Sequence, residues 1–316
     1  MLEYIVRRVL SGILVLFLLS TVLFFVMRLV PGDVVRLQLA DAGSVTPERM
    51  AEIESQLGLD KPAITQYGTW LGGVLTGDFG ESLWERRPVS EMIWQRFPVT
   101  FELALLSIII AIAIGVLTGV GSAIKRGSAT DNSLRVGSVI GLSIPNFFLA
   151  LLMITFMSLA FNWVAPLGYK RPNEDLLVNL QQMAMPALAL GLGVAAAIAR
   201  MTRSSMLEVL NADYIRTVRS KGAGESNINF KHALRNSMVP IITLIGLQFG
   251  ALLGGTVILE SIFNLPGIGS MVFRAVEQRD YPVIQAAGLL YGGIFVFVNI
   301  AVDVTYGWID PRIRRS

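Results

Sequence analysis

The sequence predicts an all-α integral membrane protein with six transmembrane helices. Hydrophobic residues make up 53% of its 316 residues, and the mean hydropathy is +0.60, well above that of a soluble domain. Six long stretches contain no Asp, Glu, Lys or Arg, and each is near or above the roughly 20 residues that a helix needs to cross a bilayer. These stretches are Val9–Met27, Leu103–Ile124, Val136–Tyr169, Leu176–Ala199, Asn236–Leu259 and Tyr281–Val302.

The first stretch is expected to be a retained transmembrane helix within residues 1–30. Arg7 and Arg8 precede it, as basic residues precede the apolar core of a cleaved signal peptide. The apolar run is longer than the roughly 7–15 residues of such a core, and no small-residue cleavage site follows it. We therefore favour a helix that stays in the membrane over a segment that is removed.

Residues 31–97 are expected to form a folded loop outside the membrane. Thr46, followed by proline and glutamate, predicts the start of a helix, and Gly58 predicts its end. Apolar residues recur at helical spacing within Ile64–Val74 and within Val89–Phe97. Two roles are possible for this loop. The simpler one is to cover the ends of the membrane helices, and the other is to form a docking surface for a soluble substrate-delivery protein.

The third stretch is too long for one simple span, so its helix is expected to bend at Pro145. Irregular backbone at membrane depth is tolerated only where it is buried or lines a cavity. Polar side chains within spans are costly and often functional. The candidates for a pathway through the membrane are therefore Pro145, Asn146, Gln248, Gly250 and Asn299.

The fourth stretch, Leu176–Ala199, is the hardest to place. Pro186 and several polar residues crowd its start, so the helix is expected to begin near Met185 and to extend past Arg200. Arg200 and Arg203 would then reach toward the cytoplasmic membrane surface, as long basic side chains do near helix ends.

Glycines at a spacing of four residues occur in several spans. In the fifth, Gly246, Gly250 and Gly254 would let a neighbouring backbone approach closely. This pattern predicts a tightly packed central helix, and a groove facing a pore is the competing interpretation, which the sequence does not exclude.

Basic residues gather on one side of the predicted spans. The N-terminus, the 125–135 connection, the 214–240 interval and the C-terminal tail are net basic, whereas the short connections on the opposite side balance bases with acids. Because Lys and Arg accumulate in cytoplasmic loops, both termini and the 214–240 interval are expected in the cytoplasm.

Several kinds of chemistry are excluded by composition. The chain has no cysteine, so it can form no disulfide and no thiolate metal site. Its single histidine, His232, rules out a histidine metal cluster, and no catalytic residues are assigned. The sequence contains no phosphate-binding P-loop motif. Its net positive charge does not indicate nucleic-acid binding, because the Lys and Arg residues in excess lie beside the membrane spans.

The longest polar interval of the C-terminal half is Tyr214–Pro240. Its first part, through Lys221, reads as a short helix that ends at Gly222, a position where a positive φ is plausible. Ser226 is expected to cap a second helix that runs into Asn236. An ordinary solvated loop is the simplest interpretation of such a basic segment.

This interval resembles the cytoplasmic loop by which permeases of ABC importers dock into their ATPase subunits. The version typical of the dipeptide and oligopeptide branch, R-T-A-R-A-K-G … H-A-L-R-N-x-x-x-P, matches here through Pro240, with Val218 and Ser220 in place of alanines. In the general family pattern, which has Glu-Ala-Ala and Ile-x-Leu-Pro, Gly222 and Leu234 match and the remaining places differ. The resemblance implies ATPase-coupling residues Arg216, Thr217, Val218, Arg219, Lys221, Gly222, His232, Leu234 and Arg235.

The resemblance extends over essentially the whole chain, including Pro31-Gly32-Asp33, Gly77-Asp78-Phe79-Gly80 and Asp310-Pro311-Arg312. It implies an ABC importer permease fold. In this fold residues 1–30 form the N-terminus and first helix, 31–97 the external loop, and 98–316 a five-helix core that includes a coupling loop at 211–236.

The resemblance also implies partners. These are a second, homologous permease, two ABC ATPase subunits that hold ATP and Mg, and an extracytoplasmic substrate-binding protein. The chain itself would hold no cofactor and no metal. It would lie in the lipid bilayer of a bacterial or archaeal plasma membrane.

The expected function is that of a non-catalytic permease subunit of an ABC importer for dipeptides, oligopeptides or small peptides such as glutathione. The alternative is a secondary transporter driven by an ion gradient. Such a protein should show an internal repeat and a carboxylate well inside a span, and the sequence shows neither. An intramembrane enzyme would need clustered catalytic groups, which are missing. The sequence does not distinguish peptide cargo from nickel complexes or sugars.

Overall fold

The computed structural model describes residues 2–29 and 61–309. These residues form helices and one isolated bridge between Glu81 and Pro88, without strands. Among them five helices are long and apolar enough to cross a membrane, or six if a sharply bent pair is one span, in agreement with the predicted all-α membrane fold. The helix expected after Thr46 lies outside the described residues.

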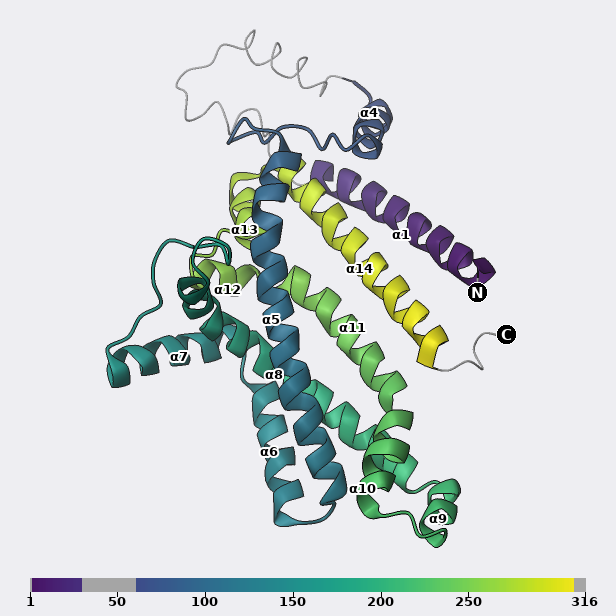
Figure 1. Ribbon diagram of the computed structural model, residues 1–316. Coiled ribbons are helices and arrows are strands. Elements are labelled where there is room, and N and C mark those ends of the chain that lie inside the picture. The colour runs from purple at the N-terminus through teal and green to yellow at the C-terminus, as the bar shows by residue number, and fades with distance from the viewer. Residues whose placement is uncertain (1, 30–60, 310–316) are drawn as a thin grey trace. The chain divides into compact units, whose positions relative to one another are not determined.

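The helices in Figure 1 are α1 (Leu2–Leu29), α4 (Ala63–Leu75), α5 (Val89–Ile124), α6 (Ala129–Ser143), α7 (Asn146–Phe161), α8 (Leu176–Leu210), α9 (Asp213–Ser220), α10 (Glu225–Asn227), the π-helix Ile228–Leu234, α11 (Met238–Gly255), α12 (Val257–Ile262), α13 (Ile268–Gln278) and α14 (Tyr281–Ile309).

The chain divides into two compact units. Unit 1 comprises Val99–Pro266 and the chain from Phe297 onward, and unit 2 comprises Leu2–Pro98 and Gly267–Val296. The predicted division at residues 30 and 97 stays a prediction, since the units group the chain differently: Gly267–Val296 joins the N-terminal part.

Unit 2 holds α1 against α4 and α14. The Tyr67 hydroxyl of α4 hydrogen-bonds Ser20 (3.0 Å) and Thr21 (2.9 Å) of α1. A Cβ atom on Gly288 of α14 would lie 2.8 Å from a methyl of Leu23, so glycine lets the two helices approach closely without displacing the Leu23 side chain. Close approach at a small-residue step is thus confirmed for this pair.

The segment before α5 is folded within unit 2. The buried carboxylate of Asp280 accepts hydrogen bonds from the Ser82 hydroxyl (2.5 Å) and from the Leu83 amide (3.3 Å). The Trp84 indole donates to the Gln278 carbonyl at 2.7 Å. An apolar core that includes Val89, Met92, Met271, Ala275 and Val283 lies beside these bonds. The described residues before α5 thus pack within unit 2, while the bounds of the predicted loop, its folding as a whole and its external location stay predictions.

Unit 1 is built around α8, whose residues are mostly buried between α6, α7 and α11. The expected start at Met185 was wrong, because α8 begins at Leu176 with the Asp175 side chain accepting from the Val178 amide at 3.1 Å. Pro186 lies inside the helix. The polar side chain of Gln182 is buried and hydrogen-bonds backbone of the preceding loop, so it stabilises the helix start.

The third hydrophobic stretch is broken, as predicted, at Pro145. α6 and α7 meet there at an angle of 100° (Figure 1). Pro145 caps α7, whose large apolar side chains are exposed on several sides, with only Ala150 buried. Within unit 1 this helix therefore lacks the protein surroundings that α8 has.

Glycines of both α5 and α11 make the closest packing in unit 1. A Cβ on Gly119 would lie 2.5 Å from the Thr202 Cβ of α8, and one on Gly115 would lie 2.7 Å from the Ala195 carbonyl. On α11, Gly246 is tightly packed against Val302, but Gly254 has nothing within 4 Å. Close packing on the fifth span is therefore found at Gly246 and not at Gly254, and a groove facing a pore stays the competing prediction for the rest of the span.

Candidate functional site

The segment from α9 to the π-helix forms a compact projection at one end of unit 1, here called the knob and defined as residues 213–236 (Figure 1). α9 ends at Ser220 with Lys221 as its C-cap, and Gly222 follows with φ of +82°. This left-handed conformation disfavours every residue with a Cβ, so the glycine permits the turn. The Gly222 amide donates to the Arg219 carbonyl at 3.0 Å, which closes the end of α9.

The second helix of the knob differs from the prediction. Ser226 is not its N-cap, because that place belongs to Gly224. α10 is only three residues long and passes directly into a seven-residue π-helix, Ile228–Leu234. π-helical turns are rare and occur frequently at functional sites.

The knob is fixed to the long helices by its apolar residues. Ile215 and Ile228 are fully buried. Ala233 and Leu234 pack in a cluster with Val120 of α5 and with Met206 of α8. Movement of the knob would therefore act directly on the ends of α5 and α8.

Most of the predicted coupling residues lie on the surface of the knob. Val218, His232 and Leu234 are half-buried, and the remaining ones are exposed: Arg216, Thr217, Arg219, Lys221, Gly222 and Arg235. The structure thus brings the nine residues into one small body, with polar side chains outside and apolar ones toward the helices.

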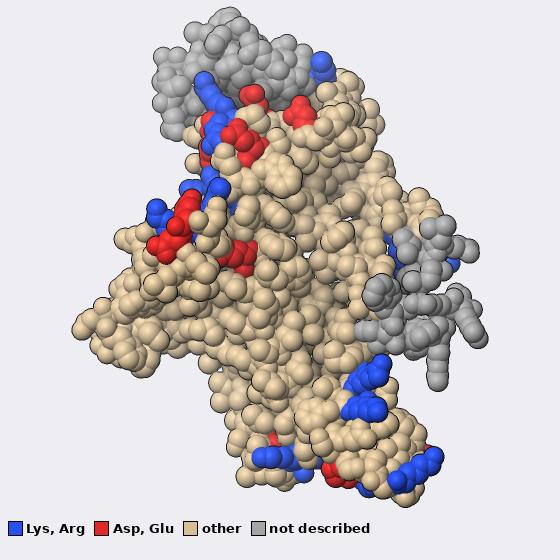
Figure 2. Space-filling model, viewed as in Figure 1, with Lys and Arg blue, Asp and Glu red and all other residues tan. Residues whose placement is uncertain are grey.

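The knob's charges are only partly paired. Arg219 binds Glu225 through two hydrogen bonds of 2.7 and 3.2 Å, and this guanidinium lowers the pKa of the Glu225 carboxyl. Arg216 lies 3.4 Å from Asp213. Within the described part of the chain Lys221 and Arg235 have no acidic partner. Figure 2 shows blue side chains gathered at this end of unit 1. The surface suits an acidic partner.

A buried ion pair beside the knob was missed by sequence reasoning. Arg203 of α8 donates two hydrogen bonds of 2.9 Å to Asp131 of α6, which is 1% exposed. Asp131 also accepts from Ser122 of α5 (2.5 Å) and from the Gly127 amide (3.0 Å). Arg203 therefore joins three helices and does not extend freely to the membrane surface as expected. Asp131 and Arg203 are 72 residues apart in sequence, and no local pattern indicates their pairing.

The predicted pathway residues lie on separate elements of the structure. Pro145 and Asn146 lie at the break between α6 and α7, and a Cβ on Gly193 of α8 would lie 2.5 Å from the Asn146 amide oxygen. Gln248 and Gly250 lie half-buried on α11, and Asn299 lies half-buried on α14. Their role in a pathway stays a prediction.

Comparison with known proteins identifies the family. A family model described as "Binding-protein-dependent transport system inner membrane component" matches residues 90–315, and the model of its N-terminal part matches residues 1–104. The dipeptide transport system permease protein DppB of Alkalihalophilus pseudofirmus is 40% identical over 334 residues, covering 99% of this chain and 100% of the relative. The glutathione transport system permease protein GsiC of Escherichia coli K12 is 40% identical over 315 residues, covering 99% of both.

A solved structure shares the fold. A chain of the MetNI methionine ABC transporter in an inward-facing conformation matches with a TM-score of 0.55 and 19% identity, over 69% of this chain and 96% of that chain. The resemblance found in Tyr214–Pro240 is thus confirmed along the whole sequence. Because the family models and the relatives cover nearly its full length, the chain belongs to the family of binding-protein-dependent transport system inner membrane components.

Proposed function

We propose that this chain is the transmembrane subunit of an ABC importer for dipeptides, oligopeptides or a small peptide such as glutathione. Relatives named as dipeptide and glutathione permeases, each 40% identical over nearly the whole chain, support this cargo class. In this proposal the chain catalyses no reaction, and its partner subunits hydrolyse ATP.

The observation that carries the proposal is the construction of the knob. Its outer surface presents the cations of Lys221 and Arg235, which lack acidic partners within the described residues, and its inner surface packs through Leu234 on α5 and α8. A partner that binds the outer surface could move the helices without touching the membrane. Charge-assisted hydrogen bonds to acids of an ATPase would supply the contact.

The complete transporter would contain several chains. We propose a heterodimer with a second, homologous permease, two ATPase subunits that bind ATP and Mg at the cytoplasmic knob, and a binding protein on the opposite side. Both termini of this chain would be cytoplasmic. Pro145, Asn146, Gln248, Gly250 and Asn299 are proposed to contact the cargo as the helices alternate between two conformations.

Reconstitution tests this function directly. The purified chain alone in vesicles should hydrolyse no ATP and accumulate no peptide, since it has no P-loop. Vesicles that also contain the ATPases, the second permease and the binding protein should take up peptide when ATP is supplied. Uptake by this chain alone, driven by an imposed ion gradient, would replace the proposal with a secondary transporter.

A further inference from the structure

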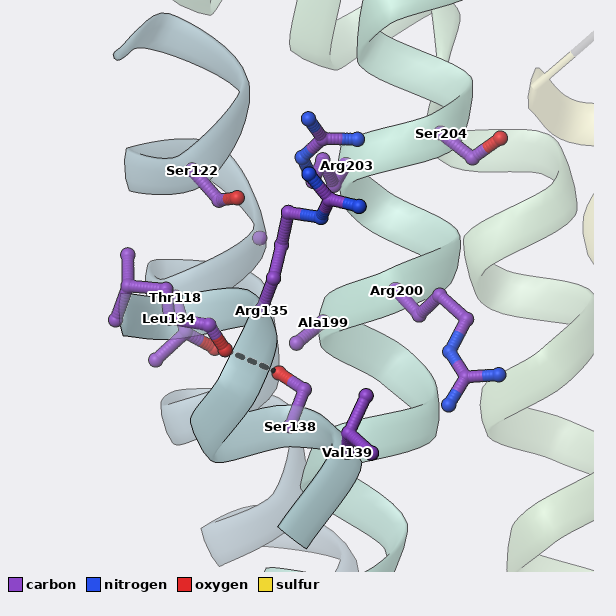
Figure 3. Close-up of a pocket in the computed structure, with 11 residues that line it drawn as sticks. Thr118, Ser122, Leu134, Arg135, Ser138, Val139, Ala199, Arg200, Arg203 and Ser204 are labelled. Atoms are coloured by element: carbon purple, nitrogen blue, oxygen red, sulfur yellow. Dashed lines mark hydrogen bonds between the residues drawn. The ribbon is translucent and has the colours of Figure 1, made fainter. Parts of the chain in front are cut away.

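A basic pocket lies between α5, α6 and α8, all within unit 1. Its volume is about 310 Å³, and Figure 3 shows the side chains that line it. Its polar lining residues are Thr118, Ser122, Arg135, Ser138, Arg200, Arg203 and Ser204. None of the predicted pathway or coupling residues lines this pocket, so the proposed transport function gives it no role.

The positive charge of the pocket exceeds its negative charge. Three guanidinium groups line it, and only Arg203 has an acid, because Asp131 binds it from behind at 2.9 Å. Arg135 and Arg200 form no ion pair with any residue that the structure describes. The pocket therefore carries a net charge of about +2, counting three arginines and one aspartate.

The arrangement of the side chains favours a bound anion. In Figure 3 the Arg135 and Arg203 side chains extend toward the same region, whereas the Arg200 side chain starts one turn away on α8 and extends away from them. The Arg135 and Arg203 guanidinium groups carry like charges, and an anion bound between them would offset their repulsion. Guanidinium groups bind phosphate oxygens with two parallel hydrogen bonds, so a phosphate matches this set.

Hydroxyl groups line the same pocket. Ser138 donates to the Leu134 carbonyl at 2.8 Å, and Thr118 donates to the Ile114 carbonyl at 2.6 Å. Both oxygens are fixed by these bonds to their own helices. Ser204 is exposed and free to donate to an added oxygen.

The surroundings of the pocket point to a lipid as the source of the phosphate. Val136, Val139 and Ile140 are 58%, 57% and 53% exposed on α6, and Val139 also lines the pocket. In a membrane protein, large apolar side chains this exposed face acyl chains or another protein. A headgroup in the pocket could therefore place its acyl chains along α6. Basic pockets between transmembrane helices on the cytoplasmic side are a known way of binding anionic headgroups.

We propose that the pocket binds the phosphate of an anionic phospholipid, with Arg135 as a direct ligand and with Arg200 as a second one once its exposed side chain turns toward the phosphate. Arg203 contributes a fixed positive wall, because Asp131 and Ser122 hold it. The bound lipid would join α6 to α8 close to the point where α8 leads into the knob. This inference does not depend on the proposed transport function.

The test compares lipid binding by the full-length chain and two double variants. Phosphatidylglycerol and phosphatidylcholine are titrated into the purified protein in uncharged detergent, and bound lipid is counted by native mass spectrometry. Arg135→Gln/Arg200→Gln removes the two ligands. Lys125→Gln/Arg126→Gln is the matched control, since it removes two exposed cations of the neighbouring α5–α6 turn that do not line the pocket.

The wild type should bind one phosphatidylglycerol in preference to phosphatidylcholine. The ligand variant should bind it about 25-fold more weakly, because each basic residue near an anionic headgroup contributes roughly a factor of five. The control should change binding by less than about twofold, since neither Lys125 nor Arg126 lines the pocket. Thermal unfolding without added lipid should be alike for all three proteins, because Arg135 and Arg200 form no ion pair with any described residue.

Three results would overturn the proposal. One is equal binding of phosphatidylglycerol by the wild type and the ligand variant. Another is equal binding of phosphatidylcholine and phosphatidylglycerol by the wild type. The third is displacement of the lipid by millimolar inorganic phosphate with the same dependence on Arg135 and Arg200, which would make the pocket a site for free anions. Loss of a co-purified protein subunit from the ligand variant, with lipid binding intact, would assign the arginines to a protein interface.

Discussion

A buried carboxylate, that of Asp131, links the helices next to the knob through its ion pair and hydrogen bonds. Asp131 is 1% exposed, and its ion pair with Arg203 also receives hydrogen bonds from Ser122 and from the Gly127 amide. The four donors satisfy the carboxylate oxygens, so the cost of burying the charge is offset. Removal of one partner would leave the other charge buried and unpaired.

Asp131→Ala should lower the free energy of unfolding by about 1–3 kcal/mol, because Arg203, which is 23% exposed, would lose its only carboxylate partner among the described residues. Asp213→Ala serves as the control, since it removes the exposed pair with Arg216 and should cost at most about 1 kcal/mol. Thermal or denaturant unfolding in detergent measures both. Equal, small effects of the two substitutions would show that the Asp131 pair does not hold the helices together.

Packing between elements depends on glycine where two helices cross. Gly119 of α5 faces Thr202 of α8 so closely that a methyl group would have to move backbone or side chain, whereas Gly137 of α6 has nothing within 4 Å of its missing Cβ. The same substitution should therefore have opposite effects at these two positions.

Gly119→Ala should destabilise the protein by about 1–3 kcal/mol through overpacking. Gly137→Ala should be neutral or stabilise it by up to about 1 kcal/mol, because alanine has the higher helix propensity. The melting temperatures of the two variants in the same detergent provide the comparison. A destabilised Gly137→Ala together with an unaffected Gly119→Ala would mean that α5 and α8 do not cross at this glycine.

The elements could be predicted from sequence to different extents. Charge-free stretches predict α1, α5, α8, α11 and α14 well, since a bilayer requires long apolar helices. The break at Pro145 was also predictable, because proline ends a helix locally. The early start of α8 was not, since it depends on hydrogen bonds from Gln182 to a loop.

The knob was predicted in outline and not in detail. Gly222 was identified because a left-handed turn favours glycine, a local property. The π-helix Ile228–Leu234 has no comparable local signal. Its residues Ile228 and Ala233 are fully buried, so packing against other helices determines the wider turn. Asp131 and Arg203 escaped prediction for the same reason: their contact exists only after α6 and α8 have packed.

At the scale of the whole molecule, the central question is which parts face the cytoplasm. The chain has no cysteine, so single cysteines can be introduced and labelled in intact cells with a reagent that does not cross membranes. Lys170→Cys should be labelled from outside, and Lys221→Cys only after the cells are opened, because basic loops stay in the cytoplasm. Both side chains are exposed on the protein surface, so a difference in labelling would not come from burial of either one. The reverse pattern would invert the orientation and place the knob outside.

The knob is central to the proposed function because it is the proposed contact with the ATPases. Gly222 and Gly168 both have positive φ, of +82° and +76°, and neither has an atom within 4 Å of the position that a Cβ would occupy. Gly222→Asp and Gly168→Asp therefore impose a similar backbone strain of roughly 1–2 kcal/mol and the same added charge. Only the first places the change on the proposed ATPase surface, whereas the second lies in the loop before α8.

The most direct measurement is co-purification of the ATPase subunits with each variant, together with ATP hydrolysis stimulated by the binding protein and peptide. Gly222→Asp should insert in the membrane and retain the second permease, yet lose the ATPases or their stimulated hydrolysis. Gly168→Asp should keep both. Full ATPase attachment and full coupled transport by Gly222→Asp would contradict the proposed role of the knob and leave residues 213–236 as an ordinary basic loop.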